Sequence, residues 1–154
     1  MGVFHSSRFH SAGSRAVALV ATHLPRLIAL AWAAWAAPTA YAYKDGAPVQ
    51  LQSADDLMLL PLWIFWAVAA VLLAAGALVP PGAGPRQVEV ARWMRIAGLA
   101  ICACLLSMWG VSFLDADAAR GWVSAKNYIF MAFMALISAY LAGRDRVRVR
   151  GANV

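Results

Sequence analysis

The sequence predicts an all-α protein: an integral membrane bundle of four transmembrane helices. Of its 154 residues, 63% are hydrophobic and 13% are charged, which is about half the charge of an ordinary soluble domain. A chain of this length cannot bury so much apolar surface within itself, so lipid must cover the remainder. The apolar residues also gather in four runs, with most of the basic residues beside them. No length remains for a separate soluble domain.

The chain divides into three parts. Residues 1–26 form a polar and basic N-terminal arm, which we expect to be partly disordered. Its stretch from Ser14 to Leu24 has the pattern of an amphipathic interfacial helix. Residues 27–142 form the transmembrane domain, and residues 143–154 form a basic tail expected to contact anionic lipid on the cytoplasmic side. The arm contains all three histidines, His5, His10 and His23, whose spacing matches no standard zinc pattern and whose role stays open.

The first apolar run, "LIALAWAAWAAPTAYAY" at residues 27–43, has two interpretations. It ends in an A-x-A pattern, so it could be a secretory signal cleaved after Ala42. The long polar stretch before it is unusual for a signal, and an A-x-A pattern arises easily in a segment so rich in alanine. We favour a retained span, in which Pro38 ends or kinks the helix. Cleavage would change the number of spans and leave the orientation of the others unchanged.

The other three runs are expected at residues 57–79, 93–114 and 122–142. The run at 57–79 carries no charge and is long enough to cross a bilayer core of about 30 Å. Pro61 falls in its expected first turn, where proline is tolerated. Ser53 and Asp56 have the spacing of a capping box just before it. The segment "PPGAGPRQVEVAR" is expected to break the helix and reverse the chain.

The distribution of charge predicts that both termini are cytoplasmic. With four spans, ten basic residues lie on the inner side and three on the outer side, a strong positive-inside bias. The inner residues are Arg8, Arg15, Arg26, Arg86, Arg92, Arg95, Arg144, Arg146, Arg148 and Arg150. The outer basic residues are Lys44, Arg120 and Lys126, accompanied by Asp45, Asp55, Asp56, Asp115 and Asp117. The chain is therefore expected to be a multi-pass protein of the bacterial cytoplasmic membrane.

The acidic residues and histidines of the chain all lie outside the middle of the expected spans. Proton relays, ion sites and haem ligands in membranes depend on such groups. Cys102 and Cys104 stand at i and i+2 of one run, so they are not expected to bridge or to share a metal. The outer aspartates are expected to be solvated loop charges and helix caps. We predict no catalytic, cofactor-binding or metal site, and no enzyme.

Aromatic and small residues give the remaining patterns. We expect interfacial belts of Tyr41, Tyr43, Trp109, Phe113, Trp122 and Tyr128 on the outer side and of Trp93 and Tyr140 on the inner side. The i, i+3 pairs Trp32–Trp35 and Trp63–Trp66 are expected to pack between helices, with a lipid or quinone surface as the alternative. Small residues recur at four-residue steps, which favours close helix packing in lipid. These are Ala29, Ala33 and Ala37; Ala70 and Ala74; Gly98 and Cys102; and Ala135, Ala139 and Gly143.

One segment resembles a known group of proteins. The stretch "WGVSFLDADAARGWVSAKNYIFMAFMALISAYLAGRDR" joins a tryptophan-containing span end, an acidic turn, and a last span with a basic tail. It is similar to small multi-span membrane proteins of actinobacterial phages, some of them holins. The resemblance covers about the final third of the chain. It implies a protein that assembles in the membrane, and it transfers no catalytic residue.

Three functions follow as expectations. The first is holin-like: a small membrane protein that self-associates and permeabilises the cytoplasmic membrane. The second is a non-catalytic structural or accessory subunit that binds another membrane protein, and the third is a small transporter. The net charge of +6 does not predict nucleic-acid binding, because no groove-reading or base-stacking motif accompanies it. The expected partners are the lipid bilayer and either further copies of the chain or another membrane protein.

Overall fold

The protein is all-helical in the residues that its computed structural model describes, which are 7–80, 82–116 and 121–143. Side chains are described from Thr22 onward, apart from Ser53. The elements are the α-helices and one 3-10 turn: α1 (Ser7–Ala42), η1 (Val49–Leu51), α2 (Gln52–Asp56), α3 (Leu62–Leu78), α4 (Pro85–Ala116) and α5 (Gly121–Gly143). The all-α fold class is confirmed.

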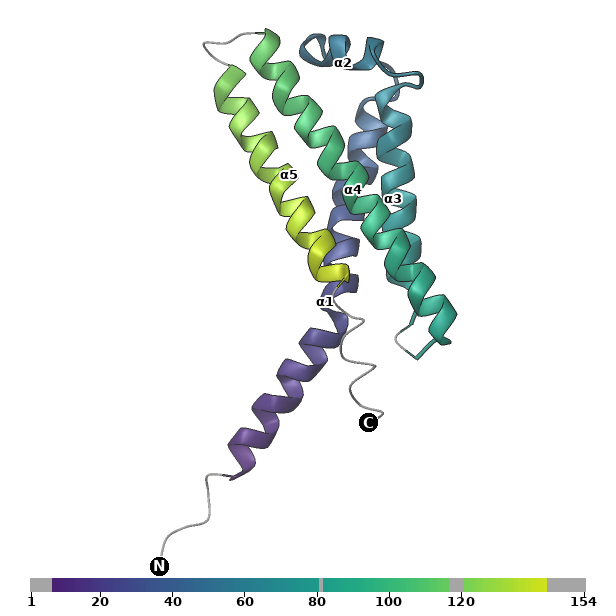
Figure 1. Cartoon of the computed structure of the whole chain (residues 1–154), viewed down its shortest axis with the longest axis vertical. Coiled ribbons are helices and arrows are strands. Elements are labelled where there is room, and N and C mark those ends of the chain that lie inside the picture. The colour runs from purple at the N-terminus through teal and green to yellow at the C-terminus, as the bar shows by residue number, and fades with distance from the viewer. Residues whose placement is uncertain (1–6, 81, 117–120, 144–154) are drawn as a thin grey trace, which may run out of the picture.

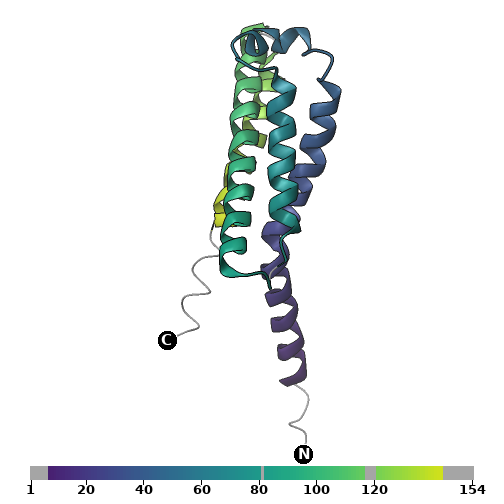
Figure 2. The same ribbon diagram turned by 90° about the vertical axis from the view of Figure 1, so that its right-hand side faces the viewer.

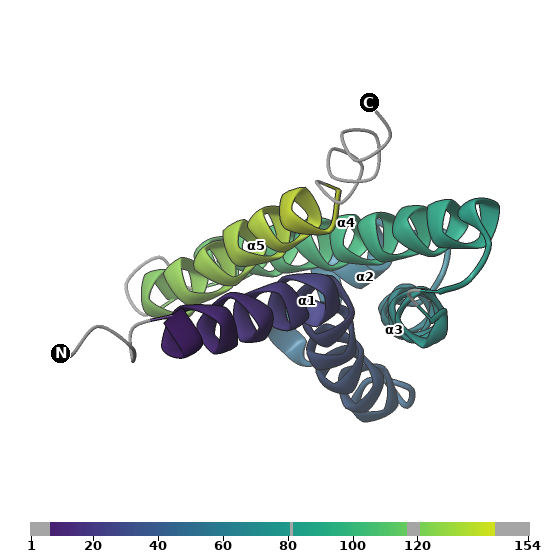
Figure 3. The same cartoon turned by 90° about the horizontal axis from the view of Figure 1, so that it is seen from below.

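The four long helices form two hairpins joined in the middle. α1 packs against α3, α3 against α4, and α4 against α5, whereas α1 and α5 make few contacts. All four run along one long axis, with η1 and α2 at the end opposite the N-terminus (Figures 1 and 2). Seen along this axis, α1 and α5 diverge from each other (Figure 3). The bundle is therefore an open row of helices and lacks a fully packed α1–α5 contact.

Helix α1 is longer than the predicted span. It is continuous over 36 residues, or about 54 Å at 1.5 Å per residue. The boundary expected at residue 26 is therefore not a helix boundary. The N-terminal part of α1 extends beyond the bundle (Figure 1), and Pro25 is its first buried residue among the described side chains. Pro38 does not end the helix, which continues for another turn.

Helix α3 begins five residues later than predicted. Pro61 precedes the helix with φ −53° and ψ 140°, and the residue before a proline is disfavoured in the helical conformation. A helix over residues 57–61 would therefore be broken at Leu60. The predicted capping box is also absent, because Asp56 ends the short helix α2. Instead Asp55 Oδ1 accepts a hydrogen bond of 2.7 Å from the backbone N–H of Leu62, the first residue of α3.

Helix α4 begins earlier than predicted, at Pro85. Proline is well suited to the first helical position, because its missing N–H would have no partner there. The non-helical segment between α3 and α4 is therefore short and ends just before Pro85. Helix α5 coincides within one residue with the helix expected at 122–142.

Glycines set the close approach between neighbouring helices. A Cβ on Gly98 of α4 would lie 2.7 Å from Leu73 Cγ of α3, and one on Gly76 would lie 2.8 Å from Arg95 Cγ. A Cβ on Gly110 would lie 2.8 Å from Ile129 Cγ1 of α5. These positions exclude larger residues, as small-residue packing in membranes requires. Among the described side chains of α1, the buried residues after Pro25 are Ala29, Ala33, Ala36 and Ala40, so the small-residue face differs from the predicted one at Ala37, which is exposed.

Candidate functional site

A cluster of rings lies toward the end of the bundle that carries η1 and α2. We call it the aromatic cluster; its members are Trp32, Trp35, Tyr43, Trp66, Trp109, Phe113 and Tyr128. Trp66 of α3 is fully buried, and its ring centroid lies 5.0 Å from that of Trp35 and 5.1 Å from that of Trp109. These distances are typical of favourable aromatic pairs. The cluster therefore connects all four long helices.

The Trp109 ring contacts three other rings of this cluster, those of Tyr43, Trp66 and Tyr128. Only 2% of the residue is exposed. Its centroid lies 5.3 Å from both Tyr43 and Tyr128, each nearly perpendicular to it, so it bridges the end of α1 and the first half of α5. Tyr128 also stacks on Phe113 at 5.3 Å and 13°. Edge-to-face packing of this kind adds to the stabilisation from burial alone.

Two indole N–H groups in the cluster have no hydrogen-bond acceptor among the described residues. They are Nε1 of Trp66 and Nε1 of Trp109, both buried. A buried donor without an acceptor costs about 1–3 kcal/mol. N–H groups can point at aromatic faces, and rings lie nearly perpendicular to both indoles, at 82° between Trp35 and Trp66 and at 89° between Trp109 and Tyr128.

An open-sided groove runs beside the cluster, between α1 and α5. We call it the lateral groove; it consists of two adjoining cavities that share Trp35. The outer cavity has a volume of about 360 Å³ and is lined by Trp35, Pro38, Thr39, Ala42, Tyr43, Trp109 and Tyr128. The inner cavity has a volume of about 200 Å³ and is lined by Ala31, Trp32, Trp35 and Met131. Its lining is apolar and aromatic, with hydroxyl groups only toward the outer end.

A hydrogen bond links α1 and α5 at the inner end of the lateral groove. Trp32 Nε1 donates to Ser138 Oγ over 3.2 Å, and Ser138 Oγ in turn donates to the backbone oxygen of Met134 at 2.8 Å. Ser138 is buried. This hydrogen bond therefore joins α1 and α5, which otherwise make few contacts.

Arginines connect helices at the opposite end of the bundle, where α3 and α5 end. Arg26 Nε of α1 donates to the backbone oxygen of Ala77, in the last turn of α3, at 2.8 Å. Arg92 of α4 is 5% exposed; its Nη2 lies 2.6 Å from Glu89 Oε1, and its Nη1 lies 3.5 Å from the backbone oxygen of Gly143. Both arginines thus lie near carbonyl groups at a helix C-terminus, where positive charge is favourable.

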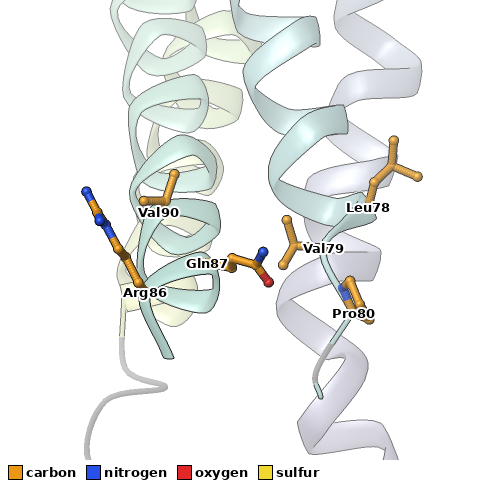
Figure 4. Close-up of a pocket in the computed structure, with 6 residues that line it drawn as sticks. All are labelled: Leu78, Val79, Pro80, Arg86, Gln87 and Val90. Carbon is orange, nitrogen blue, oxygen red and sulfur yellow. The ribbon is translucent and has the colours of Figure 1, made fainter. Parts of the chain in front are cut away.

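A second cleft lies between the end of α3 and the start of α4. Its volume is about 540 Å³, and it is lined by Leu78, Val79, Pro80, Arg86, Gln87 and Val90. Gln87 is directed toward Val79, whereas the Arg86 side chain turns away from α3 (Figure 4). The cleft is therefore mainly apolar, and its one charged residue is not directed into it.

The structure separates the predicted interfacial aromatics into two groups. Tyr41, Trp122, Trp93 and Tyr140 are all more than half exposed, as residues of a belt would be. Trp109 was assigned to the outer belt and is instead buried, with Tyr43, Phe113 and Tyr128 around it. Trp63 and Trp66 do not act as a pair, because Trp66 turns to Trp35 and Trp109. The Trp32–Trp35 pair is in contact, at 5.9 Å.

The cysteines, histidines and acidic residues do not form a site among the described residues. Cys102 is buried, Cys104 is exposed, and both are free thiols. Within residues 7–80, 82–116 and 121–143, no group of three or more His, Cys, Asp or Glu side chains could hold a metal ion. His23 is exposed, while His5, Asp117 and the tail arginines lie outside the described residues. The lateral groove could not be predicted from the sequence, in which its one signal is the spacing of Trp32 and Trp35.

Comparison of the chain with protein-family models, with curated proteins and with solved structures gives no match. The candidate site is thus defined by its own geometry: an aromatic-lined groove in one half of the bundle and arginine contacts at the other end.

Proposed function

We propose that the protein spans the bacterial cytoplasmic membrane four times, with both termini in the cytoplasm. Helices α4 and α5 are long and apolar enough to cross a membrane. Helices α1 and α3 run beside them along the same axis (Figure 2). The 17 residues of α3 span about 26 Å, which is close to the thickness of a bilayer core of about 30 Å.

The uncovered surface of α5 is the observation that carries this proposal. Only 28% of its most apolar stretch is buried within the chain. The large side chains that it exposes are Ile129, Phe130, Phe133, Met134, Leu136, Ile137, Tyr140 and Leu141. Water-soluble monomers do not expose such a continuous apolar patch, whereas a membrane span or an assembly interface does.

The connection between α2 and α3 supports the same placement. Leu57, Leu59 and Leu60 are exposed, Leu59 completely so, while Leu51 and Ala54 of the preceding turns are buried in the bundle. The exposed leucines lie at the end of the bundle next to the start of α3. Such residues would be unfavourable in water and are favourable in the outer leaflet.

We propose a non-catalytic, holin-like function for this membrane protein, in which copies self-associate and permeabilise the membrane. The resemblance of the final third of the chain to holin-like phage proteins supports it. The exposed face of α5 provides a surface on which further copies can assemble, and helix association in lipid depends on such packing contacts.

Controlled expression in a bacterium tests this function. We expect a sudden loss of membrane potential and entry of an impermeant dye some time after induction. A co-expressed cytoplasmic endolysin should then lyse the cells. In a comparison variant, serine replaces Phe130 and Phe133 of the exposed α5 face. This change should delay or abolish the loss of membrane potential. An intact potential at high membrane expression of the unaltered chain would refute the function.

The second candidate, an accessory subunit of a membrane complex, is favoured by α1. The N-terminal part of this helix extends beyond the bundle (Figure 1), where it is available to a partner. Harmless expression and a stoichiometric protein partner that is lost when residues 1–21 are deleted would support this candidate over the first.

A further inference from the structure

We propose that the lateral groove binds one acyl chain of a phospholipid from the outer leaflet. This inference rests on the proposed membrane topology, which places the groove in the outer half of the bilayer. It goes beyond general contact with lipid, because it assigns one chain to a defined position between α1 and α5.

The size of the groove selects this occupant over a helix of another copy. A helix with a diameter of 10–12 Å occupies on the order of 500 Å³ for each turn of 5.4 Å. The outer cavity has about 360 Å³ and the inner one about 200 Å³, so together they hold little more than one helical turn. The same space, distributed along the groove, suits a thin flexible chain.

The length of the groove matches one leaflet. Its lining on α1 runs from Ala31 to Ala42, which corresponds to about 16 Å at 1.5 Å per residue. Half of a bilayer core of about 30 Å is about 15 Å. An acyl chain that enters at the outer interface would therefore end near Ala31, at the bilayer midplane.

The ends of the groove differ as this occupant requires. The outer end carries the phenol hydroxyls of Tyr43 and Tyr128, at the depth where ester oxygens of a phospholipid accept hydrogen bonds. The Thr39 hydroxyl already donates to the backbone oxygen of Trp35 at 2.8 Å. The inner end is bounded by Trp32, which is tied to Ser138. Beside it lies Met131, a flexible residue that adapts to irregular apolar partners.

Photo-crosslinking in reconstituted bilayers tests the proposal. The full chain is placed in phosphatidylglycerol and phosphatidylethanolamine vesicles that contain a phospholipid with a diazirine in the middle of one acyl chain. Labelled sites are identified by peptide mass spectrometry. We expect labels at Trp35, Ala42 and Met131 that saturate at a low proportion of probe. Labels on the exposed face of α5, at Phe133 and Ile137, should rise in proportion to the amount of probe, without saturation.

Two groove-filling variants provide the decisive comparison. Ala42→Phe and Ala31→Phe each place a ring in the groove at an exposed alanine, and each should lower groove labelling about tenfold, the effect of about 1.4 kcal/mol of lost affinity. Ala37→Phe is the matched control, because Ala37 is exposed on α1 and does not line the groove. Labelling on the outer face of α5 should be unchanged in all three.

The possible outcomes separate this inference from the proposed function. Equal groove labelling in the filled variants and the control would overturn the acyl-chain site while leaving the membrane topology intact. Labelling of the α5 face without any labelling of the groove would also overturn it, as expected if a second copy occupies the groove. Absence of labelling from both the groove and the α5 face would overturn the membrane placement itself.

Discussion

Individual arginines at the end of the bundle opposite η1 and α2 contact neighbouring helices and also carry the charge on which the proposed orientation depends. Their charge supports the proposed orientation through the positive-inside bias. In addition, Arg26 reaches the last turn of α3 through Ala77, and Arg92 pairs with Glu89 beside the end of α5. A planar guanidinium offers several donors in fixed directions, so it can contact a neighbouring helix end while its charge stays near the interface.

We therefore predict that replacing Arg26 with methionine destabilises the bundle. The change removes a charged donor to Ala77 and keeps most of the apolar stem. The free energy of unfolding should fall by about 1.5 kcal/mol, the lower end for hydrogen bonds of charged groups, because Arg26 is only partly buried. Unfolding by sodium dodecyl sulfate in mixed micelles measures the effect. Arg86→Met is the control, because it removes the same charge from an exposed position; equal losses in both variants would contradict the prediction.

At the scale of elements, hydropathy located the helices, and local chemistry determined their ends. The apolar run at residues 57–79 could not reveal that Pro61 delays α3 to Leu62, since Leu57–Leu60 are as apolar as the helix itself. At Pro85 proline has the opposite effect: it occupies the first position of α4, so this helix begins earlier than its apolar run. Proline disfavours helix in the residue before it and fits the first helical position, so hydropathy alone cannot place either boundary.

The candidate site was less predictable than the helices. Tryptophan is typical both of interfacial belts and of packed cores, and the sequence does not distinguish these uses. Trp109 lies near the outer end of its run, yet it is buried because Tyr43 and Tyr128 from two other segments meet it. The lateral groove exists only because α1 and α5 diverge (Figure 3), and that divergence is a property of packing between distant residues.

Contact between α4 and α5 provides a second prediction, at Gly121. A Cβ at this first residue of α5 would overlap the backbone carbonyl of Phe113 in α4. Gly121→Ala should therefore lower the free energy of unfolding by about 1–3 kcal/mol, as overpacking does. Gly82→Ala is the matched control, because nothing lies within 4 Å of its added Cβ. Thermal unfolding followed by circular dichroism in detergent compares them, and equal midpoints would show that the close α4–α5 approach is not required.

For the whole molecule, the proposed orientation depends on the sum of charges on each side. Replacing Arg144, Arg146, Arg148 and Arg150 with glutamate should place part of the population with its C-terminus outside, because it removes four of the ten inner basic residues. A C-terminal fluorescent-protein fusion, which fluoresces only in the cytoplasm, reports the fraction. The control, Arg120→Glu with Lys126→Glu, strengthens the bias and should leave the C-terminus inside. Full fluorescence in both variants would argue against an orientation set by the tail.

The order of the contacts along the chain has a consequence for biogenesis. Helix α1 packs on α3 and helix α4 on α5, so each pair consists of neighbours in sequence. The first pair can associate in the membrane while the ribosome is still translating the second, because local contacts need little loop closure. The bond from Trp32 to Ser138 joins residues 106 positions apart, and it can form only after the last helix has been inserted. An interruption of synthesis within α5 would thus leave an assembled first hairpin with half of its lateral groove open to lipid.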